Sequence, residues 1–473
     1  MNRVALLRDV SAELRHRRLV WAGIRGDDAE PLADLPQFEG AYTIINAYSR
    51  RLSVDGYAYE DLTGVRVDLE TWDIDDHLDA PQTATFRRVM LQALSAPSAL
   101  LPYRPSSFLS AIYFARRDRC LNLGLFGGHQ AAFEHKPWVE TSLSDLGVRT
   151  IPWTYVADEE QLRTDEMLRR GPLILRRSRT SGGEGIVRVD DAGQARLQWP
   201  RVAEAFVSVA PFLSGGVPVN VGATAWHDGV TVHYPSVQLI GIPDCVTRPF
   251  GYCGNDYGRV KDLGRDILDQ IETATITIGN WLRGYGYRGT FGVDFLVHDG
   301  VPLFTEVNPR FQGSTHASCK LAIDAGESCL MLEHLAAILG MSAPPQRPVA
   351  ELAAEAPALA HFVVHWVGDR AERLDPSPLV RLAMATGRSI RAEVQTRPAL
   401  LTQRGAAVAR IVCRESVTRT GFDLTQPWAG VVSTWKAGAA GVPAASAAAA
   451  SPASAVAGPQ GAEQVMTPGS LGG

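Results

Sequence analysis

Two acids and an amide in the stretch GTFGVDFLVHDGVPLFTEVN have the residue types and the spacing of a magnesium site. Asp294 lies inside the apolar run GVDFLV, and Glu306 and Asn308 lie in the apolar run LFTEVN. Burying an unpaired charge is costly, so acids inside apolar runs indicate a paired or metal-binding role; surface acids beside an ordinary hairpin turn are the alternative. Mg²⁺ takes oxygen ligands and shares them with phosphates, whereas two carboxylates and an amide make a poor zinc or copper site.

A β-hairpin would bring these side chains together. GTFGVDFLV has the pattern of a strand, HDG that of a tight turn, and VPLFTEVN that of the antiparallel partner. Residues twelve apart across a short turn can face each other on one side of a sheet, so Asp294 and Glu306 are expected to converge. Arg310 follows in NPR, which places a cation beside the acidic cluster.

A second signal is the glycine-rich stretch LILRRSRTSGGEGIVRV, residues 173–189, which has the pattern strand, loop, strand. Glycines expose backbone N–H groups and allow a close approach, so such a loop can close over a polyphosphate. No GK[ST] follows, so the loop is not a Walker A sequence. A plain hairpin turn is the alternative.

The hairpin residues resemble the metal-binding end of the ATP-grasp superfamily, which includes D-alanine–D-alanine ligases, biotin carboxylases and many peptide-forming ligases. The resemblance implies that Asp294, Glu306 and Asn308 hold Mg²⁺ against the phosphates of ATP, with Mn²⁺ as the alternative metal. Arg310 matches the basic residue near the transferred phosphate and is the catalytic candidate.

The resemblance extends to the glycine-rich stretch, which is similar to the flexible loop that covers the phosphates in this superfamily. The ATP-binding candidates that it implies are Arg176, Ser181, Gly182, Gly183 and Gly185. The family usually has a lysine where this chain has Arg176. Arginine binds phosphate through a rigid fork and lysine acts as a point charge, so either Arg176 or Arg177 is the working residue.

Two further segments resemble nucleotide-binding parts of the family. Lys136 begins a predicted helix that ends near Gly147 and is similar to the family's other nucleotide lysine; a solvated surface lysine is the alternative. The segment VAPFLSGG resembles the hinge that holds adenine, with backbone hydrogen bonds and an apolar wall from Phe212 and Leu213, or these two residues are ordinary core. Asn220 is a candidate ribose contact.

Several other polar residues are candidates for the substrate pocket. Four of them, downstream of the hinge, either line an acceptor pocket or are polar loop residues: Gln238, Arg248, Asn255 and Asp256. His316 and Lys320, four apart on a helix, either face the reaction centre or serve in capping and packing. His361 and His365 flank an apolar strand, and no acid or cysteine at ligand spacing accompanies them, so metal binding is not expected.

The elements that must position these residues form a multidomain α/β and α+β chain. Residues 1–133 contain the predicted strands RLVWAGI and AYTIINAY and a helix at TATFRRVMLQALSA, similar to the α/β unit that precedes many ATP-grasp domains. Arg25, Asp27 and Asp28 end the first strand, where α/β proteins often bind ligands; a capped loop is the alternative.

Residues 134–340 form the expected ATP-grasp domain. One helix in it carries an apolar stripe made of Leu263, Ile267, Ile271, Ala274, Ile278 and Leu282. SCKLAIDAGESCLMLEHLAAILG is expected to form its last helix. Residues 350–436 are expected to form a small C-terminal α+β appendage, and residues 437–473, rich in Ala, Gly, Pro and Ser, a disordered tail.

Composition agrees with a cytoplasmic enzyme. A net charge of −5, with no basic stripe, argues against nucleic acid as the main partner. No apolar run reaches membrane-spanning length, and charges interrupt the N-terminus too often for a signal peptide. The six cysteines show no CxxC pair and are expected to be reduced.

The sequence therefore predicts an ATP-dependent carboxylate–amine ligase that forms an acyl phosphate from a small carboxylate and joins it to an amine such as an amino acid or peptide. The arrangement of segments is similar to bacterial peptide ligases of secondary metabolism, of the pheganomycin type. A homodimer is left open. The alternatives are a subunit of a biotin-dependent carboxylase and a non-catalytic nucleotide-binding module.

Overall fold

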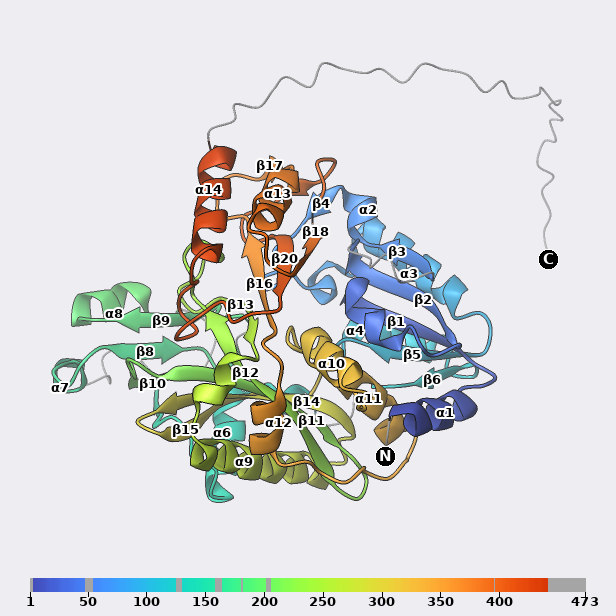
Figure 1. Cartoon of the computed structure of the whole chain (residues 1–473), viewed down its shortest axis with the longest axis horizontal. Coiled ribbons are helices and arrows are strands. Elements are labelled where there is room, and N and C mark those ends of the chain that lie inside the picture. The colour runs from blue at the N-terminus through green and yellow to red at the C-terminus, as the bar shows by residue number, and fades with distance from the viewer. Residues whose placement is uncertain are drawn as a thin grey trace, which may run out of the picture.

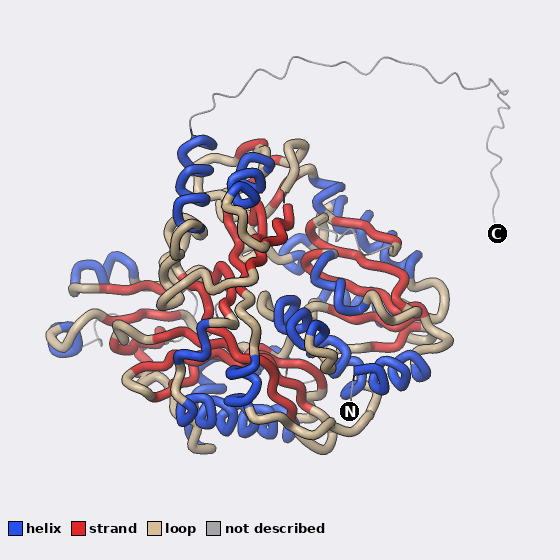
Figure 2. The backbone as a smooth tube through the Cα atoms, in the orientation of Figure 1, coloured by secondary structure: helices blue, strands red, loops and turns tan. Residues whose placement is uncertain are grey.

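The computed structural model places four sheets within the residues that it describes (Figures 1 and 2). The described residues are 3–46, 54–124, 130–157, 164–179, 182–200, 206–394 and 396–440. Two sequence predictions lie outside them: the phosphate contact of Ser181, and the tail from residue 441 onward.

The N-terminal unit is a parallel five-stranded sheet with helices on both faces. Leu19 and Trp21 face α1 and two helices from the middle of the chain, whereas the alternate residues Val20 and Ala22 face α3 and α4. In sheet order the strands are β3 (Asp55–Ala58), β2 (Phe38–Ile45), β1 (Arg18–Arg25), β5 (Ser98–Pro102) and β6 (Cys120–Asn122). The helices are α1 (Arg3–Glu13), η1 (Asp27–Leu32), α2 (Glu60–Thr63), η2 (Ile74–His77), α3 (Pro81–Ala93) and α4 (Ser107–Phe114).

A small antiparallel sheet follows and carries the glycine-rich segment. Its strands, in sheet order, are β7 (Thr154–Val156), β10 (Val207–Pro211), β8 (Leu173–Arg176) and β9 (Ile186–Val189). The nearby helices are α5 (Gln130–Phe133), α6 (Lys136–Asp145), α7 (Thr164–Leu168) and α8 (Ala192–Gln198). The predicted strand–loop–strand pattern is confirmed, and so is the helix that begins at Lys136.

The central sheet has eight strands and joins the middle of the chain to its C-terminal part. In sheet order they are β15 (Val301–Asn308), β14 (Gly289–His298), β11 (Val217–Ala225), β12 (Val230–Ile240), β13 (Tyr252–Asp256), β16 (Ala360–His365), β20 (Ala407–Cys413) and β18 (Ile390–Val394). Because β13 pairs with β16, the strands expected for the C-terminal appendage extend the central sheet. In the last sheet, β19 (Leu401–Thr402) lies between β17 (Glu372–Arg373) and β4 (Val65–Arg66) of the N-terminal unit.

Helices cover this sheet largely as predicted, with two corrections. The helix α9 (Arg265–Gly284) buries Ile271, Ile278 and Leu282 against it, but Leu263 precedes the helix. The stretch expected to form one last helix forms two, because Gly326 adopts a φ of 73° and ends the first one. These and the remaining helices are α10 (Thr315–Asp324), α11 (Leu330–Ile338), η3 (Arg259–Asp262), α12 (Val349–Glu355), α13 (Ser377–Ala385) and α14 (Trp428–Ala440).

A buried ionic cluster connects the N-terminal unit to the C-terminal strands. The guanidinium of Arg410 donates to Asp27 at 2.8 Å and to Asp28 at 3.0 Å, and it also contacts Glu393. Asp27 and Asp28 therefore hold two parts of the fold together and do not line the ligand cavity described below. Burial, opposed by Arg410, raises the pKa of Asp27 to about 7.

This raised pKa predicts a pH-dependent stability. The folded protein binds a proton at Asp27 that the unfolded chain has lost, so the associated stability is present at low pH and decreases as the pH rises through about 7. We expect the urea midpoint to fall between pH 6 and pH 8, and to fall less in Asp27→Asn, which cannot titrate. Asp34→Asn, at a side chain 59% exposed, is the control. Equal slopes for Asp27→Asn and the wild type would contradict this assignment.

Candidate active site

The β14–β15 hairpin forms as predicted, with a feature that the sequence pattern did not reveal. Asp299 and Gly300 make its turn, both with positive φ. A regular two-residue hairpin would pair Asp294 with Thr305, but a β-bulge shifts the register so that Asp294 pairs with Glu306. Thr305 and Glu306 both line the cavity as a result. The bulge therefore brings the second acid to the first.

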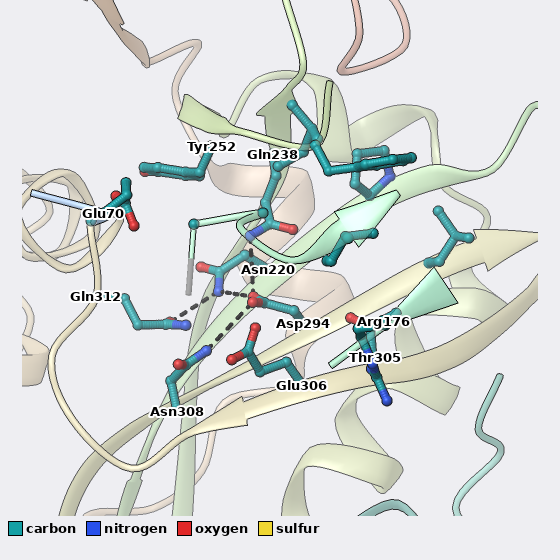
Figure 3. Close-up of a pocket in the computed structure, with 18 of the residues that line it drawn as sticks. Glu70, Arg176, Asn220, Gln238, Tyr252, Asp294, Thr305, Glu306, Asn308 and Gln312 are labelled. Atoms are coloured by element: carbon teal, nitrogen blue, oxygen red, sulfur yellow. Dashed lines mark hydrogen bonds between the residues drawn. The ribbon is translucent and has the colours of Figure 1, made fainter. Parts of the chain in front are cut away.

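Alternation along the neighbouring strands explains why polar side chains gather on this face. On β11 and β14, Val221 and Val293 lie in the core under α9, while Asn220 and Asp294, which pair with each other, face the other way. Asn220 donates to Asp294 at 2.6 Å, and Gln238 on β12 donates to the same oxygen at 3.2 Å (Figure 3). Asn220, the candidate ribose contact, belongs to this polar cluster and lines the cavity.

The two acids share one low-dielectric site, which changes the titration of Asp294. Burial first, and then the negative charge of Glu306, raise the pKa of Asp294 to about 7. The amide of Asn308 lies 3.5 Å from the second carboxylate oxygen of Asp294. A divalent cation between these oxygens would offset the repulsion, so the donor set fits Mg²⁺ once phosphates supply further ligands.

Two cations adjoin the acids. Lys136, at the start of α6, donates to Glu306 at 2.6 Å. Arg310 donates to the side-chain oxygen of Asn308 at 3.0 Å and to the carbonyl of Phe311 at 3.1 Å. Both cations line the same cavity of about 610 Å³ as the acids. The structure thus brings together all five of the predicted metal, lysine and arginine positions in this region.

Arg176 also lines the cavity but already has protein partners. Its guanidinium bonds to Glu140 at 2.6 Å and stacks on the Trp153 ring at 3.9 Å. The pair is buried, with 4% of the Arg176 side chain and 2% of the Glu140 side chain exposed. The Nε of Arg176 is buried and has no hydrogen-bond partner in the protein. Arg177 does not line the cavity, so Arg176 is the better candidate.

Removing Arg176 is therefore expected to cost stability as well as ATP binding. Arg176→Ala leaves Glu140 buried and unpaired, which should lower the free energy of unfolding by about 3–5 kcal/mol. Adding Glu140→Gln should recover much of this loss, because the buried charge is then gone. Urea denaturation measures both. Wild-type stability of Arg176→Ala, with weakened ATP binding, would mean that Arg176 acts on the nucleotide alone.

Part of the cavity wall is apolar. Phe212 and Leu213 line the cavity, together with Trp153, Ile174 and Leu296. Phe212 and Leu213 follow the end of β10. A flat aromatic base fits against an apolar wall of this kind, and the polar cluster lines the same cavity.

The glycine-rich loop packs over the cavity. Gly182 and Gly183 line it, and a side chain at Gly183 would lie 2.1 Å from the carbonyl oxygen of Phe250, so only glycine fits there. Arg248 donates to the Gly182 carbonyl at 3.2 Å and to Asp68 of the N-terminal unit at 2.7 Å. Arg248 thus ties the loop to the N-terminal unit and does not line the cavity. Gly185 has a positive φ of 68°.

The other candidate residues divide between the cavity and the core. Asn255 and Asp256 are buried on β13 and bond to protein groups, so neither lines the cavity. His316 packs near Glu30, and Lys320 lies 3.9 Å from Asp324, which favours their packing role. His365 does line the cavity, but burial lowers its pKa to about 4, so it is neutral at pH 7.

Several cavity residues were not predicted from the sequence. Glu140, the buried partner of Arg176 next to the cavity, is one of the residues that sequence reasoning missed, because no local pattern connects it to an arginine 36 residues away. Gln312 accepts from Asn220 at 2.9 Å. Glu70 and Arg104 come from the N-terminal unit, and only the fold brings them to the cavity. Among the described residues, no group of three His, Cys, Asp or Glu side chains forms another metal site.

Comparisons with known proteins agree with this fold. Residues 136–314 match the family described as "ATP-grasp domain". A formate-dependent phosphoribosylglycinamide formyltransferase from Synechococcus sp. strain CC9311 is 25% identical over 232 residues, 47% of this chain and 55% of that enzyme. The chain therefore spans about half the length of this relative.

Solved structures share the fold at low identity. N5-carboxyaminoimidazole synthetase from Staphylococcus aureus, complexed with ADP, is 11% identical with a TM-score of 0.54 over 89% of this chain and 96% of that one. Biotin carboxylase from Campylobacter jejuni is 12% identical with a TM-score of 0.56 over 85% and 89% of the two chains. None of the described helices is both long and apolar enough to span a membrane.

Proposed function

We propose that this chain is an ATP-dependent carboxylate–amine ligase, because residues 136–314 match the ATP-grasp domain family and the chain has a mixed α/β ATP-grasp fold. The observation that carries the proposal is one cavity whose lining includes both apolar side chains, among them Phe212 and Leu213, and the polar side chains Asp294, Glu306 and Arg310. The relatives' dependence on formate, itself a carboxylate, supports a carboxylate substrate.

In this proposal, the chain's own residues bind and orient the reactants. Lys136, Arg176 and the glycine-rich loop hold the phosphates of ATP. Asp294, Glu306 and Asn308 would hold Mg²⁺, which neutralises phosphate charge when bound. The γ-phosphoryl group passes to the substrate carboxylate and ADP leaves. The amine then attacks the acyl phosphate carbonyl carbon, phosphate departs, and a proton is lost from nitrogen.

Arg310 has the position to stabilise the charge that develops during this attack. Its guanidinium lies beside Asn308, at the edge of the polar cluster, and faces the same cavity. Donors placed where charge develops lower the barrier more than donors that only bind the substrate. The finer proposal is a peptide ligase of bacterial secondary metabolism, with an amino acid or peptide as the amine.

Trapping the intermediate tests the proposal. The full chain is incubated with ATP, Mg²⁺, hydroxylamine and a panel of amino acids and small carboxylates. We expect a hydroxamate from one carboxylate class, with ADP and phosphate released in equal amounts. AMP and pyrophosphate would contradict the proposal, because adenylation would then activate the acid.

The same assay separates the two alternatives. A carboxylase subunit would release ADP with bicarbonate as its carboxylate, and free biotin would increase that release. A nucleotide-binding module would bind ATP and release no ADP with any member of the panel.

A further inference from the structure

A second, smaller cavity lies in the N-terminal unit. It has a volume of about 50 Å³ and is lined by residues of β1, β2, η2, α3 and α4. Residues 22–24 of β1 line it, together with Tyr42 and Ile44 of β2. It is called the side pocket below.

The side pocket adjoins the large cavity that contains the metal-site candidates. Four residues line both cavities: Ile24, Leu69, Tyr103 and Arg104. The two cavities therefore meet at these four side chains, and a substrate in the large cavity lies next to the side pocket.

The walls of the side pocket are largely apolar. Phe86 and Met90 of α3 line it, and so does Phe108 of α4. Among the described residues that line it, Arg104 carries the one charge, and its guanidinium pairs with Asp73 at 2.7 Å. Burying a charged group in such surroundings is costly, so the pocket favours a hydrocarbon group.

The space exists before any ligand binds, because large buried side chains fix its floor. The rings of Phe86 and Phe108 stack with their centroids 5.7 Å apart, and both residues are buried, as is Met90. Ala22 faces α3 and α4 from β1, and its small side chain leaves the space open. Protein interiors have few voids larger than a water molecule, and an empty void costs stability. A void of this size beside a ligand cavity therefore indicates a ligand group.

The volume of the side pocket sets the size of that group. One water-sized group needs about 10–15 Å³ of such space, so the pocket takes about three to five of them. An isopropyl or isobutyl group fits this space, whereas an indole is too large.

We propose that the side pocket binds a branched aliphatic group, such as isopropyl or isobutyl, carried by a substrate of the ligase. The inference rests on the proposed ligase function and names the chemical class of one of its substrates. The group belongs to the acid or to the amine, because both must reach the large cavity. The pocket selects this group by its size and its apolar surface.

A graded series of substrates tests the size of the group. The full chain is incubated with ATP, Mg²⁺ and glycine, alanine, valine, leucine, phenylalanine or tryptophan, or with the matching carboxylates that lack the amino group. With hydroxylamine as the amine, the hydroxamate reports on the acid. The acid identified in this way is then offered the same amino acids as amines, and the amide product is quantified by mass spectrometry.

One of these two arms should show the preference. We expect kcat/KM to be highest for the valine or leucine side chain and about 10- to 200-fold higher than for alanine, the range that one methylene contributes in a hydrophobic pocket. Tryptophan should fall below both. The arm that shows this order identifies the substrate that carries the group.

Filling the side pocket locates the preference on the protein. Ala22→Val adds two methyl groups where β1 faces α3, so the preference for the branched side chain over alanine should fall at least about 10-fold. Its urea midpoint should stay at or above that of the wild type, because the methyl groups fill empty space. Ile44→Trp, at a half-buried position of β2, narrows the pocket and gives the same test if Ala22→Val does not fold. Ala84→Val makes the same change at an exposed position of α3 and is the control.

Two results would overturn the assignment. Equal use of all side chains, or a preference for glycine or alanine in both arms, would mean that no substrate group enters the side pocket. An unchanged preference in folded Ala22→Val and Ile44→Trp would mean that the aliphatic group binds elsewhere. Absence of hydroxamate from every carboxylate with the wild type is a different outcome, because it would remove the ligase function itself.

Discussion

Replacing Glu306 by glutamine is expected to reduce ADP formation by at least about 100-fold while the fold persists. The substitution keeps the shape of the side chain and removes one of the two carboxylates that converge through the bulge. The remaining acid cannot hold a divalent cation against triphosphate with the same charge, and donors aimed at developing charge are each worth about 10²–10³ in rate.

Stability should change little in Glu306→Gln. Its side chain is 33% exposed, so its pair with Lys136 is partly screened by solvent. The matched control is Asp299→Asn in the turn of the same hairpin, where the side chain is 90% exposed and asparagine tolerates the positive φ. ADP release and urea midpoints are measured for both variants. Near-normal turnover in Glu306→Gln would remove the metal-site assignment, and global unfolding would indicate a structural role.

The local pattern of the sequence predicted the hairpin and the convergence of Asp294 with Glu306, but not the β-bulge that produces this pairing. Apolar runs and the HDG turn fix where the strands lie, because strand periodicity and turn chemistry are local properties. The bulge lies between Phe304 and Val307, which are both buried in a core that includes strands distant in the sequence. Periodicity alone therefore predicts that Asp294 and Glu306 lie near each other, but it does not reveal the bulge through which they pair.

Long-range contacts account for the surroundings of Arg176 and for the residues that the N-terminal unit adds to the cavity, whereas the division of one helix had a local signal. Arg176 lies on a short strand in a charged segment, and nothing local shows that Glu140 and Trp153 enclose its guanidinium. The division of one predicted helix at Gly326 had a local signal, since glycine after an apolar stretch is typical of a helix end. Glu70 and Arg104 reach the cavity through the topology of the N-terminal sheet, which a single sequence does not specify.

Replacing Arg310 by alanine is expected to lower kcat about 10³-fold and to change the KM for ATP only a few-fold. Arg310 lies beside Asn308 and faces the cavity. In the proposed reaction it would contact the phosphoryl group and the tetrahedral oxyanion more closely in the transition state than in the bound substrates. An arginine that neutralises charge in phosphoryl transfer contributes about 10³–10⁵ in rate.

The planar shape and charge of the guanidinium group allow two specific tests of this prediction. Arg310→Lys keeps a point charge without the planar fork, so it should recover only part of kcat. Guanidinium ion added to Arg310→Ala should raise the rate in a saturable way and leave the wild type unchanged. Arg265→Ala, at a side chain 72% exposed on α9, controls for the loss of an arginine elsewhere. If Arg310→Ala instead kept its kcat and raised the KM for ATP, Arg310 would be a nucleotide-binding residue, and the carboxylate would need another cation at the reaction centre.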